Sequence, residues 1–426
     1  MANRFAKILF FGLLLSGIAF AEEEKVPDEE EKAPDWSVET LTGNWGGGRS
    51  SLYEKGVTVE LTHKSDFLEN SSGGIKRGSV WLANSEIAVN MDMGKLAGWN
   101  ATTVFVQYHV QHGDQTKDFN GSYVGSFAGV DNIETGTNTG QFYQAWLQKN
   151  SADDSLSLLA GLYAVDSEFY VTDTSGLFIQ PPYGMSAEMA PTGQNGDGPP
   201  VFPLGALAVR VKYASSGFYA QGVLTDGIPG NPNNPHGTHI RLGKGDGSLA
   251  VVELGYNTSE EGKSFNKTAV GLWRYSARAN DLVDVDALGN PIRRTDQGFY
   301  LLAERTLRAE QNDPAQGLSG FVRFGAVNQD VYQTDWSGSL GLQYQGLFDG
   351  RDDDTAGIAV TNSHASSKYR QLNVSDSSET VVEVTYRAQL KPWLAVQPMV
   401  QRIINPNMDT TLRDAWVAGM RLEVAF

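Results

Sequence analysis

The chain ends in the stretch AWVAGMRLEVAF, which runs from Ala415 to Phe426. Every second residue from Trp416 onward is apolar, whereas the residues between them include Arg421 and Glu423. Because successive side chains of a β-strand point to opposite faces, this alternation predicts a strand with one apolar and one polar face. Soluble chains usually end in frayed polar residues. A chain that finishes on Phe426 therefore needs a fold in which its last strand is paired.

The same alternation recurs from Val57 onward, where we find no segment with the 3.6-residue period of an ordinary helix. Counted backward from the C-terminus, the candidate strands are 415–426, 393–403, 380–390, 355–364, 338–347, 318–327, 297–307, 268–278, 248–257, 217–224, 205–213, 155–164, 140–149, 101–111, 81–92 and 56–66. These are sixteen strands, an even number, as closed bacterial barrels of one chain require.

The connections between these strands alternate between a short and a mostly longer set. The short set is 93–100, 150–154, 214–216, 258–267, 308–317, 348–354 and 391–392, and the longer set is 67–80, 112–139, 165–204, 225–247, 279–296, 328–337, 365–379 and 404–414. Outer-membrane barrels have short periplasmic turns and longer external loops, whereas a β-sandwich, which also alternates along its strands, has no reason to alternate loop length. We therefore expect an all-β fold, a transmembrane antiparallel β-barrel of about 16 strands with a short N-terminal helix and long loops that fold into the lumen.

The composition limits the other classes. The 426 residues include 33 Lys+Arg, 50 Asp+Glu and no Cys, with a formal net charge of −17. This charge argues against a nucleic-acid partner, since phosphate binding needs a basic face. The mean hydropathy of −0.31 is compatible with a membrane barrel because half of the strand residues face a wet lumen.

The N-terminal region divides into segments before the barrel. Residues 1–21 carry basic residues, an apolar run and a small-x-small site, which predicts a cleaved signal peptide; a membrane anchor is the alternative, but the run is short for spanning. Residues 22–35 are acidic and contain Pro, which predicts a disordered arm. Residues 36–55 are expected to form a periplasmic segment with a short helix, and residues 56–426 the barrel.

Polar residues opposite the apolar strand faces should point into the lumen. The candidate substrate-binding residues on the wall are Glu60, Lys64, Asn84, Glu86, Gln107, His109, Trp146, Arg210, Lys212, Glu253, Arg274, Glu304 and Arg323. A pore for one ion sign uses rings of one charge, whereas mixed charges with amides suit neutral polyhydroxylated solutes. The alternative is that these groups only hydrate and brace the wall.

The segment 165–204 is the best candidate for a loop that narrows the channel, since a barrel of sixteen strands is wide enough for an open pore. It is rich in Pro and Gly and carries the candidate binding residues Phe169, Tyr170, Phe178 and Tyr183. We expect it to fold inward and to stack its aromatic faces on sugar rings. The alternative is an external lid held by apolar contacts.

Motifs for other chemistry are weak. The pairs His109/His112 and His236/His239 have HxxH spacing but lack a third ligand, and GKGDG (243–247) lacks the spacing of a phosphate-binding loop. Asp352 to Asp354 lack the spacing of a calcium-binding loop. We therefore predict no catalytic residue, no metal and no cofactor.

Four stretches carry a resemblance to a known family: LTGNWGGGRSSLYEKGV, DSEFYVTDTSGLFIQPPYG, LLAERTLRAEQNDPAQGLSGFVRFG and PWLAVQPMVQRIINPNMDTTLRDAWVAGMRLEVAF. Over about 40–426 the chain resembles the carbohydrate-selective porins of the OprB type. The resemblance implies a Gram-negative outer-membrane barrel through which sugars, such as the monosaccharide glucose, diffuse without energy or cofactor. It also implies a short helix around 43–56 near the periplasmic mouth, and a last strand that resembles the signal read by the outer-membrane insertion machinery.

Alternatives remain open at this point. One is a general or anion-preferring porin in which Arg210, Lys212, Arg274 and Arg323 form a basic strip, and another is a secreted β-sandwich binding protein. The partners expected are small sugars, outer-membrane lipid and the insertion machinery. Homologous barrels often trimerise, but no sequence feature decides whether this chain forms a homotrimer.

Overall fold

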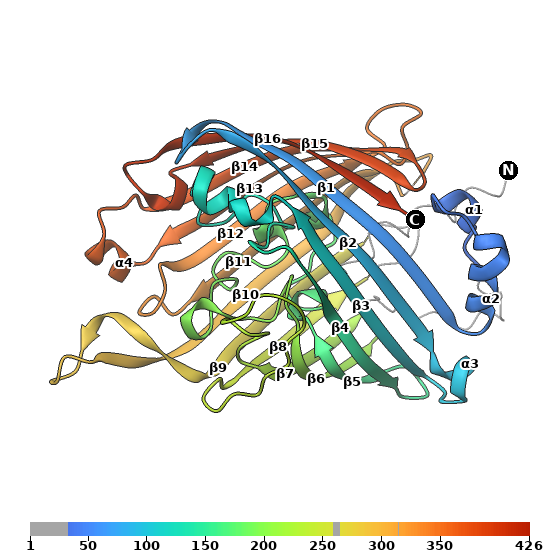
Figure 1. Cartoon of the computed structure of the whole chain (residues 1–426), viewed down its shortest axis with the longest axis horizontal. Helices are drawn as coiled ribbons and strands as arrows, with labels where there is room; N and C mark the ends of the chain where they lie inside the picture. The colour runs from blue at the N-terminus through green and yellow to red at the C-terminus, as the bar shows by residue number, and fades with distance from the viewer. Residues whose placement is uncertain (1–32, 259–264, 314) are drawn as a thin grey trace.

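The computed structural model describes residues 33–258, 265–313 and 315–426. Within these residues, sixteen antiparallel strands form one closed barrel in which β1 pairs with β16 (Figure 1). The strands are β1 (Val57–Gly74), β2 (Gly78–Asp92), β3 (Thr102–Gly113), β4 (Thr139–Asn150), β5 (Leu156–Tyr163), β6 (Ala206–Ser215), β7 (Phe218–Asp226), β8 (Ser248–Asn257), β9 (Asn266–Val285), β10 (Pro291–Ala309), β11 (Gly317–Val327), β12 (Thr334–Gln345), β13 (Thr355–Ala365), β14 (Ser378–Lys391), β15 (Leu394–Ile404) and β16 (Arg413–Ala425).

The helical elements are short. The α-helices are α1 (Trp36–Glu39), α2 (Gly48–Glu54), α3 (Met93–Ala97) and α4 (Ser367–Leu372); the remaining turns are η1 (Trp45–Gly47), η2 (Gln115–Lys117), η3 (Asn120–Val124), η4 (Val165–Ser167), η5 (Thr174–Leu177), η6 (Pro181–Tyr183), η7 (Gln194–Gly196) and η8 (Pro406–Met408). No helix in the described ranges is long and apolar enough to cross a membrane, a finding that concerns helices alone. The predicted barrel with short N-terminal helices is confirmed.

Each of the predicted strands is present, and two regions are longer than expected. β1 continues to Gly74, so most of the predicted loop 67–80 is strand. The reason is that Leu68 and Asn70 continue the inward alternation and are buried. β9 continues to Val285, and β10 begins at Pro291. The two strands therefore form a projecting hairpin over most of 279–296, where the sequence predicted a loop (Figure 1, yellow).

Salt bridges hold this hairpin to its neighbours. Lys368 of α4 lies 2.6 Å from Asp281 of the hairpin and 3.0 Å from Asp330 of the next loop. Arg294 of the hairpin lies 2.7 Å from Asp281. The hairpin extends beyond the barrel (Figure 1), and its tip is exposed, with Val285 and Leu288 among the exposed residues.

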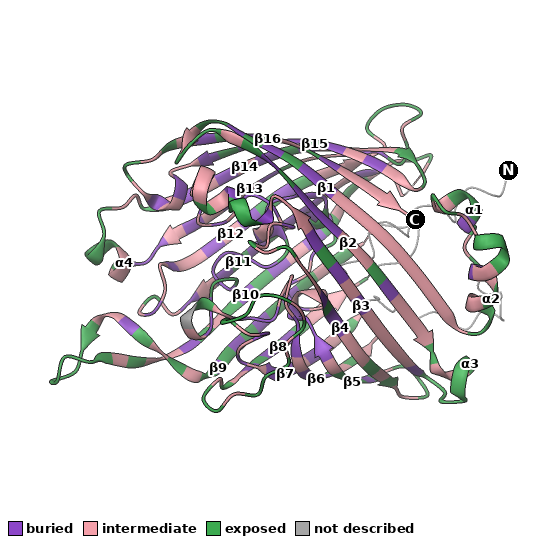
Figure 2. Ribbon diagram, in the orientation of Figure 1, coloured by how far each residue is buried: buried purple, intermediate pink, exposed green. Residues whose placement is uncertain are grey.

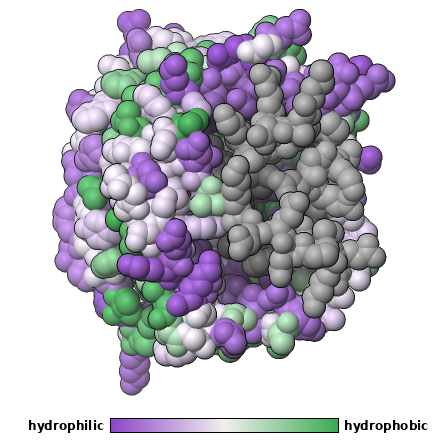
Figure 3. Space-filling view, turned by 90° about the vertical axis from the view of Figure 1, so that its right-hand side faces the viewer, coloured by the Kyte–Doolittle hydropathy of each residue, from purple (hydrophilic) through white to green (hydrophobic). Residues whose placement is uncertain are grey.

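The two ends of the barrel differ as predicted. The helices α1, α2 and α3 lie with the C-terminus and the short turns at one end, whereas α4 and the β9–β10 hairpin lie at the other (Figure 1). The first end is therefore the one that faces the periplasm. In the space-filling view of this end, hydrophilic residues gather on the visible end face and hydrophobic residues lie toward the flank (Figure 3).

The N-terminal helices are fastened to the end of the chain. Arg49 of α2 is buried, and it donates to the backbone carbonyl oxygen of Phe426 and, at 2.7 Å, to Thr40 Oγ1. The backbone N–H of Leu41 donates to the carbonyl oxygen of Ala425 at 2.8 Å. The predicted signal peptide 1–21 and most of the predicted arm 22–35 lie outside the described residues.

Deletion of Phe426 is expected to impair barrel assembly far more than it alters conduction by the molecules that assemble. The backbone N–H of Phe426 donates to the carbonyl oxygen of Leu61 at 2.8 Å, so the terminal residue extends the closure between β1 and β16. The folded fraction in membranes is measured by heat-modifiable gel mobility, and conduction by single-channel recording. The Phe426→Tyr variant keeps the terminal residue with its backbone N–H and serves as the control. Normal assembly of the truncated chain would contradict the prediction.

The core of the molecule lies inside the barrel, where loops pack on the wall. Inward residues are buried along the part of the barrel away from α1 and α2, and half-buried toward the periplasmic end (Figure 2). On β1, for example, residues 57–64 are half-buried whereas Asp66 and Leu68 are buried. Outward residues such as Leu272 and Leu340 are apolar and exposed, as is expected of a surface that contacts lipid.

Candidate functional site

The loop between β5 and β6 folds into the barrel, as predicted for 165–204. Glutamates of the wall accept hydrogen bonds from its backbone N–H groups: Glu253 from Tyr170 (3.0 Å), Glu304 from Asp173 (3.0 Å) and Thr174 (2.8 Å), and Glu383 from Ile179 (2.8 Å) and Gln180 (3.0 Å). These bonds satisfy backbone donors that would otherwise be buried without a partner. The wall carboxylates thus fix the path of the loop across the lumen.

Arg323 of β11 holds the same loop from its carbonyl side. Its guanidinium donates to the backbone oxygens of Tyr170 (2.9 Å), Pro182 (2.9 Å), Tyr183 (2.5 Å) and Gly184 (2.7 Å). The side chain is 1% exposed, and it lies 4.4 Å from the centroid of the Tyr170 ring. Because a charged donor forms stronger hydrogen bonds than a neutral one, Arg323 is a central support of the loop.

The loop aromatics Phe169, Tyr170, Phe178 and Tyr183 are only 0–3% exposed. Tyr170 stacks on Tyr300 of the wall at a centroid distance of 4.0 Å, and Phe178 and Tyr183 pack against Phe321. The expectation that these rings stack on a sugar is therefore corrected, because their faces are already covered by the wall. They fasten the loop instead.

A glycine and a loop carboxylate show how closely the loop approaches the wall. A Cβ atom added at Gly325 of β11 would lie 1.8 Å from Glu188 Oε1, so only Gly fits there. Glu188 accepts hydrogen bonds from Tyr170 Oη at 2.9 Å and from Ser337 Oγ. Burial raises the pKa of Glu188, although these bonds act in the opposite direction.

The loop between β3 and β4 also folds inward, next to the first loop. Its Val130 carbonyl accepts from Gln401 Nε2 of the wall at 2.9 Å. The N–H of Asn132 donates to the carbonyl oxygen of Ile179 at 2.9 Å, and Gln180 Nε2 donates to Gly129 at 3.1 Å. The two loops therefore meet and narrow the channel together. The sequence signal for the second loop was its apolar content, which is buried in the structure as Phe119, Val124, Val130 and Ile133.

Charges near the loops are paired. Glu168 lies 2.8 Å from Arg210 and 3.9 Å from Lys212. Burial raises the pKa of Glu168, but the attraction of Arg210 and Lys212 outweighs it and leaves the pKa below its ordinary value. On the other loop, burial and the nearby Asp66 raise the pKa of Asp131, although Arg421 lowers it.

Most predicted wall residues face the lumen, in two groups. Those buried by loops or neighbours are Asn84, Gln107, His109, Arg210, Glu253, Glu304 and Arg323, and those half-buried are Glu60, Lys64, Glu86, Trp146 and Lys212. The first group braces the wall and loops. The second group remains partly accessible from the lumen.

Arg274 is placed on the wrong face by the sequence prediction. Its neighbours on β9, Trp273 and Tyr275, are each 2% exposed and point inward, whereas Arg274 and Leu272 are exposed on the outer face. The inner wall is apolar here because it receives Tyr170, Met185 and Met189 of the inward loop. The rule that polar residues face the lumen therefore fails in this sector.

A stacked aromatic pair lies on the inner wall, and the sequence predicted only one of its members, Trp146, as a binding residue. Phe105 of β3 and Trp146 of β4 have ring centroids 5.1 Å apart with an angle of 26° between the planes, and both are half-buried. We call this pair the Phe105–Trp146 platform. Beside it, Gln107 donates to Glu86 at 2.8 Å, and Gln148 accepts from Arg210 at 2.8 Å. The platform thus combines an aromatic face with amide and carboxylate groups.

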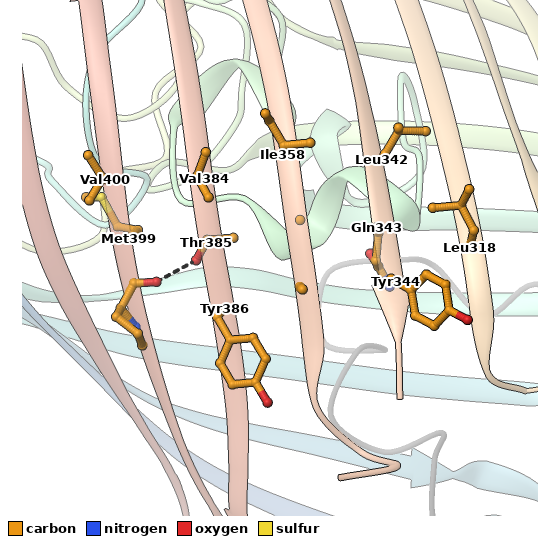
Figure 4. A pocket seen from close by; sticks show the side chains of 13 residues that line it. Leu318, Leu342, Gln343, Tyr344, Ile358, Val384, Thr385, Tyr386, Met399 and Val400 are labelled. Carbon is orange, nitrogen blue, oxygen red and sulfur yellow. Dashed lines mark hydrogen bonds between the residues drawn. The ribbon is translucent and has the colours of Figure 1, made fainter. Parts of the chain in front are cut away.

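Two other features lie outside the channel site. No group of three or more potential metal-ligating side chains occurs among the residues that the structure describes. A cavity of about 520 Å³ opens on the outer wall across β11 to β15, where Leu342, Ile358, Val384 and Val400 line it (Figure 4). Because these side chains point away from the lumen, the cavity belongs to the membrane-facing surface.

The comparisons with known proteins agree with this architecture. A family model described as carbohydrate-selective porin, OprB family, matches residues 81–426. Porin B of Pseudomonas aeruginosa is 24% identical over 422 residues, which cover 91% of each chain. Putative porin QuiX of Acinetobacter baylyi is 23% identical over 432 residues, which cover 92% of this chain and 94% of that protein.

A solved structure shows the same fold. The high-pH structure of Pseudomonas putida OprB superposes with a TM-score of 0.79 at 20% identity, covering 93% of this chain and 100% of the other. The closed barrel, the inward loops and the family match together place this chain as a non-enzymatic channel of the Gram-negative outer membrane. The chain belongs to the carbohydrate-selective porin family of the OprB type.

Proposed function

We propose that the channel passes neutral monosaccharides such as glucose by passive diffusion, and that the Phe105–Trp146 platform is where they are recognised. The observation that carries the proposal is a half-exposed aromatic stack on the inner wall beside Glu86 and Gln107. Aromatic faces can pack on the apolar face of a sugar ring, while amides and carboxylates bond to its hydroxyls. Glu60, Lys64 and Lys212 are accessible polar groups on the same inner wall.

The anion-preferring alternative has less support, because the basic residues of its proposed strip either form bonds within the protein or lie on the outer face. Arg210 is bonded to Glu168, Ser157 and Gln148, and Arg323 is bonded to loop carbonyls. Arg274 is exposed on the outer face. Lys212 lies 3.9 Å from Glu168. This leaves little uncompensated positive charge to attract anions in the lumen.

Liposome swelling tests the proposal. We expect liposomes that contain the protein to swell faster in glucose than in a zwitterionic amino acid of similar size, since the platform offers a surface for a sugar ring. Liposomes without protein set the background. Equal rates for the two solutes would reduce the protein to a general porin, and clear anion selectivity in single-channel recordings would favour the alternative.

We also propose that the assembled form is a homotrimer in which the outer face of β1 to β3 meets a second copy. Polar side chains are costly on a lipid-facing surface, yet His63 lies 2.7 Å from Ser65 and 2.8 Å from Ser85 there, and stacks on His112. The mass of the detergent-extracted protein tests this proposal. A monomeric mass in mild detergent would overturn it.

A further inference from the structure

The outer face of β9 and β10 changes abruptly from apolar to basic toward the extracellular end. On β9 the outward residues are Val270 and Leu272 and then Arg274 and Arg278, and all four are exposed. On β10 the outward face runs from Leu301 through Phe299 to Arg293. Since the strands pair Gln297 with Arg274 and Thr295 with Arg278, the three arginines occupy one continuous patch. We call Arg274, Arg278 and Arg293 the arginine patch.

An aromatic row marks the level of this patch in the membrane. On the outer face next to β10, Phe299 contacts Phe324, Phe324 stacks on Trp336 at 5.9 Å, and Trp336 stacks on His364 at 5.1 Å. Aromatic girdles of outer-membrane barrels lie at the boundary between acyl chains and headgroups. Arg274 pairs with Gln297, two residues beyond Phe299 toward the extracellular tip. The arginine patch therefore lies at the level of the outer-leaflet headgroups.

The positive charge of the patch is not neutralised by the protein. Among the described residues, Arg274, Arg278 and Arg293 form no salt bridge within 4.0 Å. Arg293 donates to Asn280 Oδ1 at 2.8 Å and to the backbone oxygen of Arg278, which holds the Arg293 side chain against β9. The carboxylate of Asp284, farther along the hairpin, is taken by Arg294 and Lys368. Among the described residues, the three arginine charges thus face outward without a carboxylate partner.

We propose that the arginine patch binds the phosphate groups of a phosphorylated glycolipid of the outer leaflet. The planar guanidinium group matches phosphate oxygens with paired donors, and the exposed apolar residues below the patch offer a surface for the acyl chains. Arg278 and Arg293 lie next to each other, whereas Arg274 is separated from Arg278 by three residues of β9, opposite the irregular pairing at Thr295 and Gln297. This spread favours a headgroup with more than one phosphate over a single phosphate ester.

Native mass spectrometry with defined lipids tests the proposal, and lipid A with two phosphates is the probe. The protein variants are the triple variant Arg274→Gln/Arg278→Gln/Arg293→Gln and a matched control, Arg305→Gln/Arg308→Gln, which removes exposed arginines near the opposite end of β10. We expect the triple variant to bind lipid A roughly a hundredfold more weakly, since each basic residue near an anionic lipid surface contributes about a factor of five. The control should bind like the native protein.

The lipid series separates a specific site from general attraction to anionic lipid. We expect the native protein to prefer lipid A with two phosphates over its form with one phosphate and over phosphatidylglycerol. Unchanged lipid A binding by the triple variant, or equal binding of lipid A and phosphatidylglycerol by the native protein, would overturn the proposal. If the triple variant does not fold, as judged by gel mobility, Arg274→Gln alone is compared with Arg305→Gln by the same criteria.

Discussion

Replacing Arg323 with Met is expected to open the channel: single-channel conductance should rise, and the preference for sugar over an amino acid of similar size should fall. The guanidinium donates to backbone oxygens of Tyr170, Pro182, Tyr183 and Gly184 in a position that water does not reach. Met fills a similar volume but leaves these carbonyls without a donor. A buried acceptor left without its donor costs about 1–3 kcal/mol, and here the cost falls on the loop that narrows the lumen.

The control for this variant is Arg305→Met, which removes an exposed arginine from the adjacent strand β10. Exposed substitutions change stability by about 0.5 kcal/mol or less, so its conductance should match that of the native protein. Hydrogen exchange of residues 171–184 reports directly on loop attachment, and we expect faster exchange in Arg323→Met only. A variant with native conductance and native exchange would show that the wall glutamates hold the loop without Arg323.

Alternation in the sequence was sufficient to predict the barrel, because along each strand the side chains face the lipid and the lumen in turn. β16 illustrates this: Trp416 and Met420 are exposed on the outer face, while Arg421 bonds to Asp66 inside the lumen. Long loops with aromatic residues were also informative, since the segment after β5 carries enough apolar surface to pack inside. The mixed charges and amides of the inward residues indicated a neutral polyhydroxylated solute, and the family resemblance added that this solute is a sugar.

Strand alternation could not predict which site residues meet a solute, because the inward loops form a hydrophobic core of their own against the inner wall. Arg274 was placed inward on the assumption of a wet inner wall, but the loop core of Tyr170 and Met189 makes the inner face apolar at Trp273. For the same reason Phe178 and Tyr183 attach the loop rather than face a solute. Phe105 was overlooked as a binding residue because its partner Trp146 lies on another strand, and only the register brings them together.

Replacing Trp146 with Ala is expected to weaken sugar binding in the channel by about tenfold, which corresponds to ~1.4 kcal/mol. Stacking between aromatic faces contributes roughly 0.5–1.5 kcal/mol beyond the burial of area, and Trp146 supplies the larger face of the Phe105–Trp146 platform. Binding is measured as the glucose concentration that half-blocks the ion current of a single channel. Because the variant removes bulk from the wall, the current without sugar should not decrease.

The matched control is Phe142→Ala, which removes an aromatic residue from the same strand on the opposite face, where Phe142 is 46% exposed. This variant should keep the native half-blocking concentration, since its side chain does not reach the lumen. If glucose half-blocks the Trp146→Ala channel at the native concentration, the Phe105–Trp146 platform is not the recognition surface, because the loss of Trp146 removes most of its aromatic face. Recognition would then have to come from the accessible polar groups alone, and Glu86→Gln would become the informative variant.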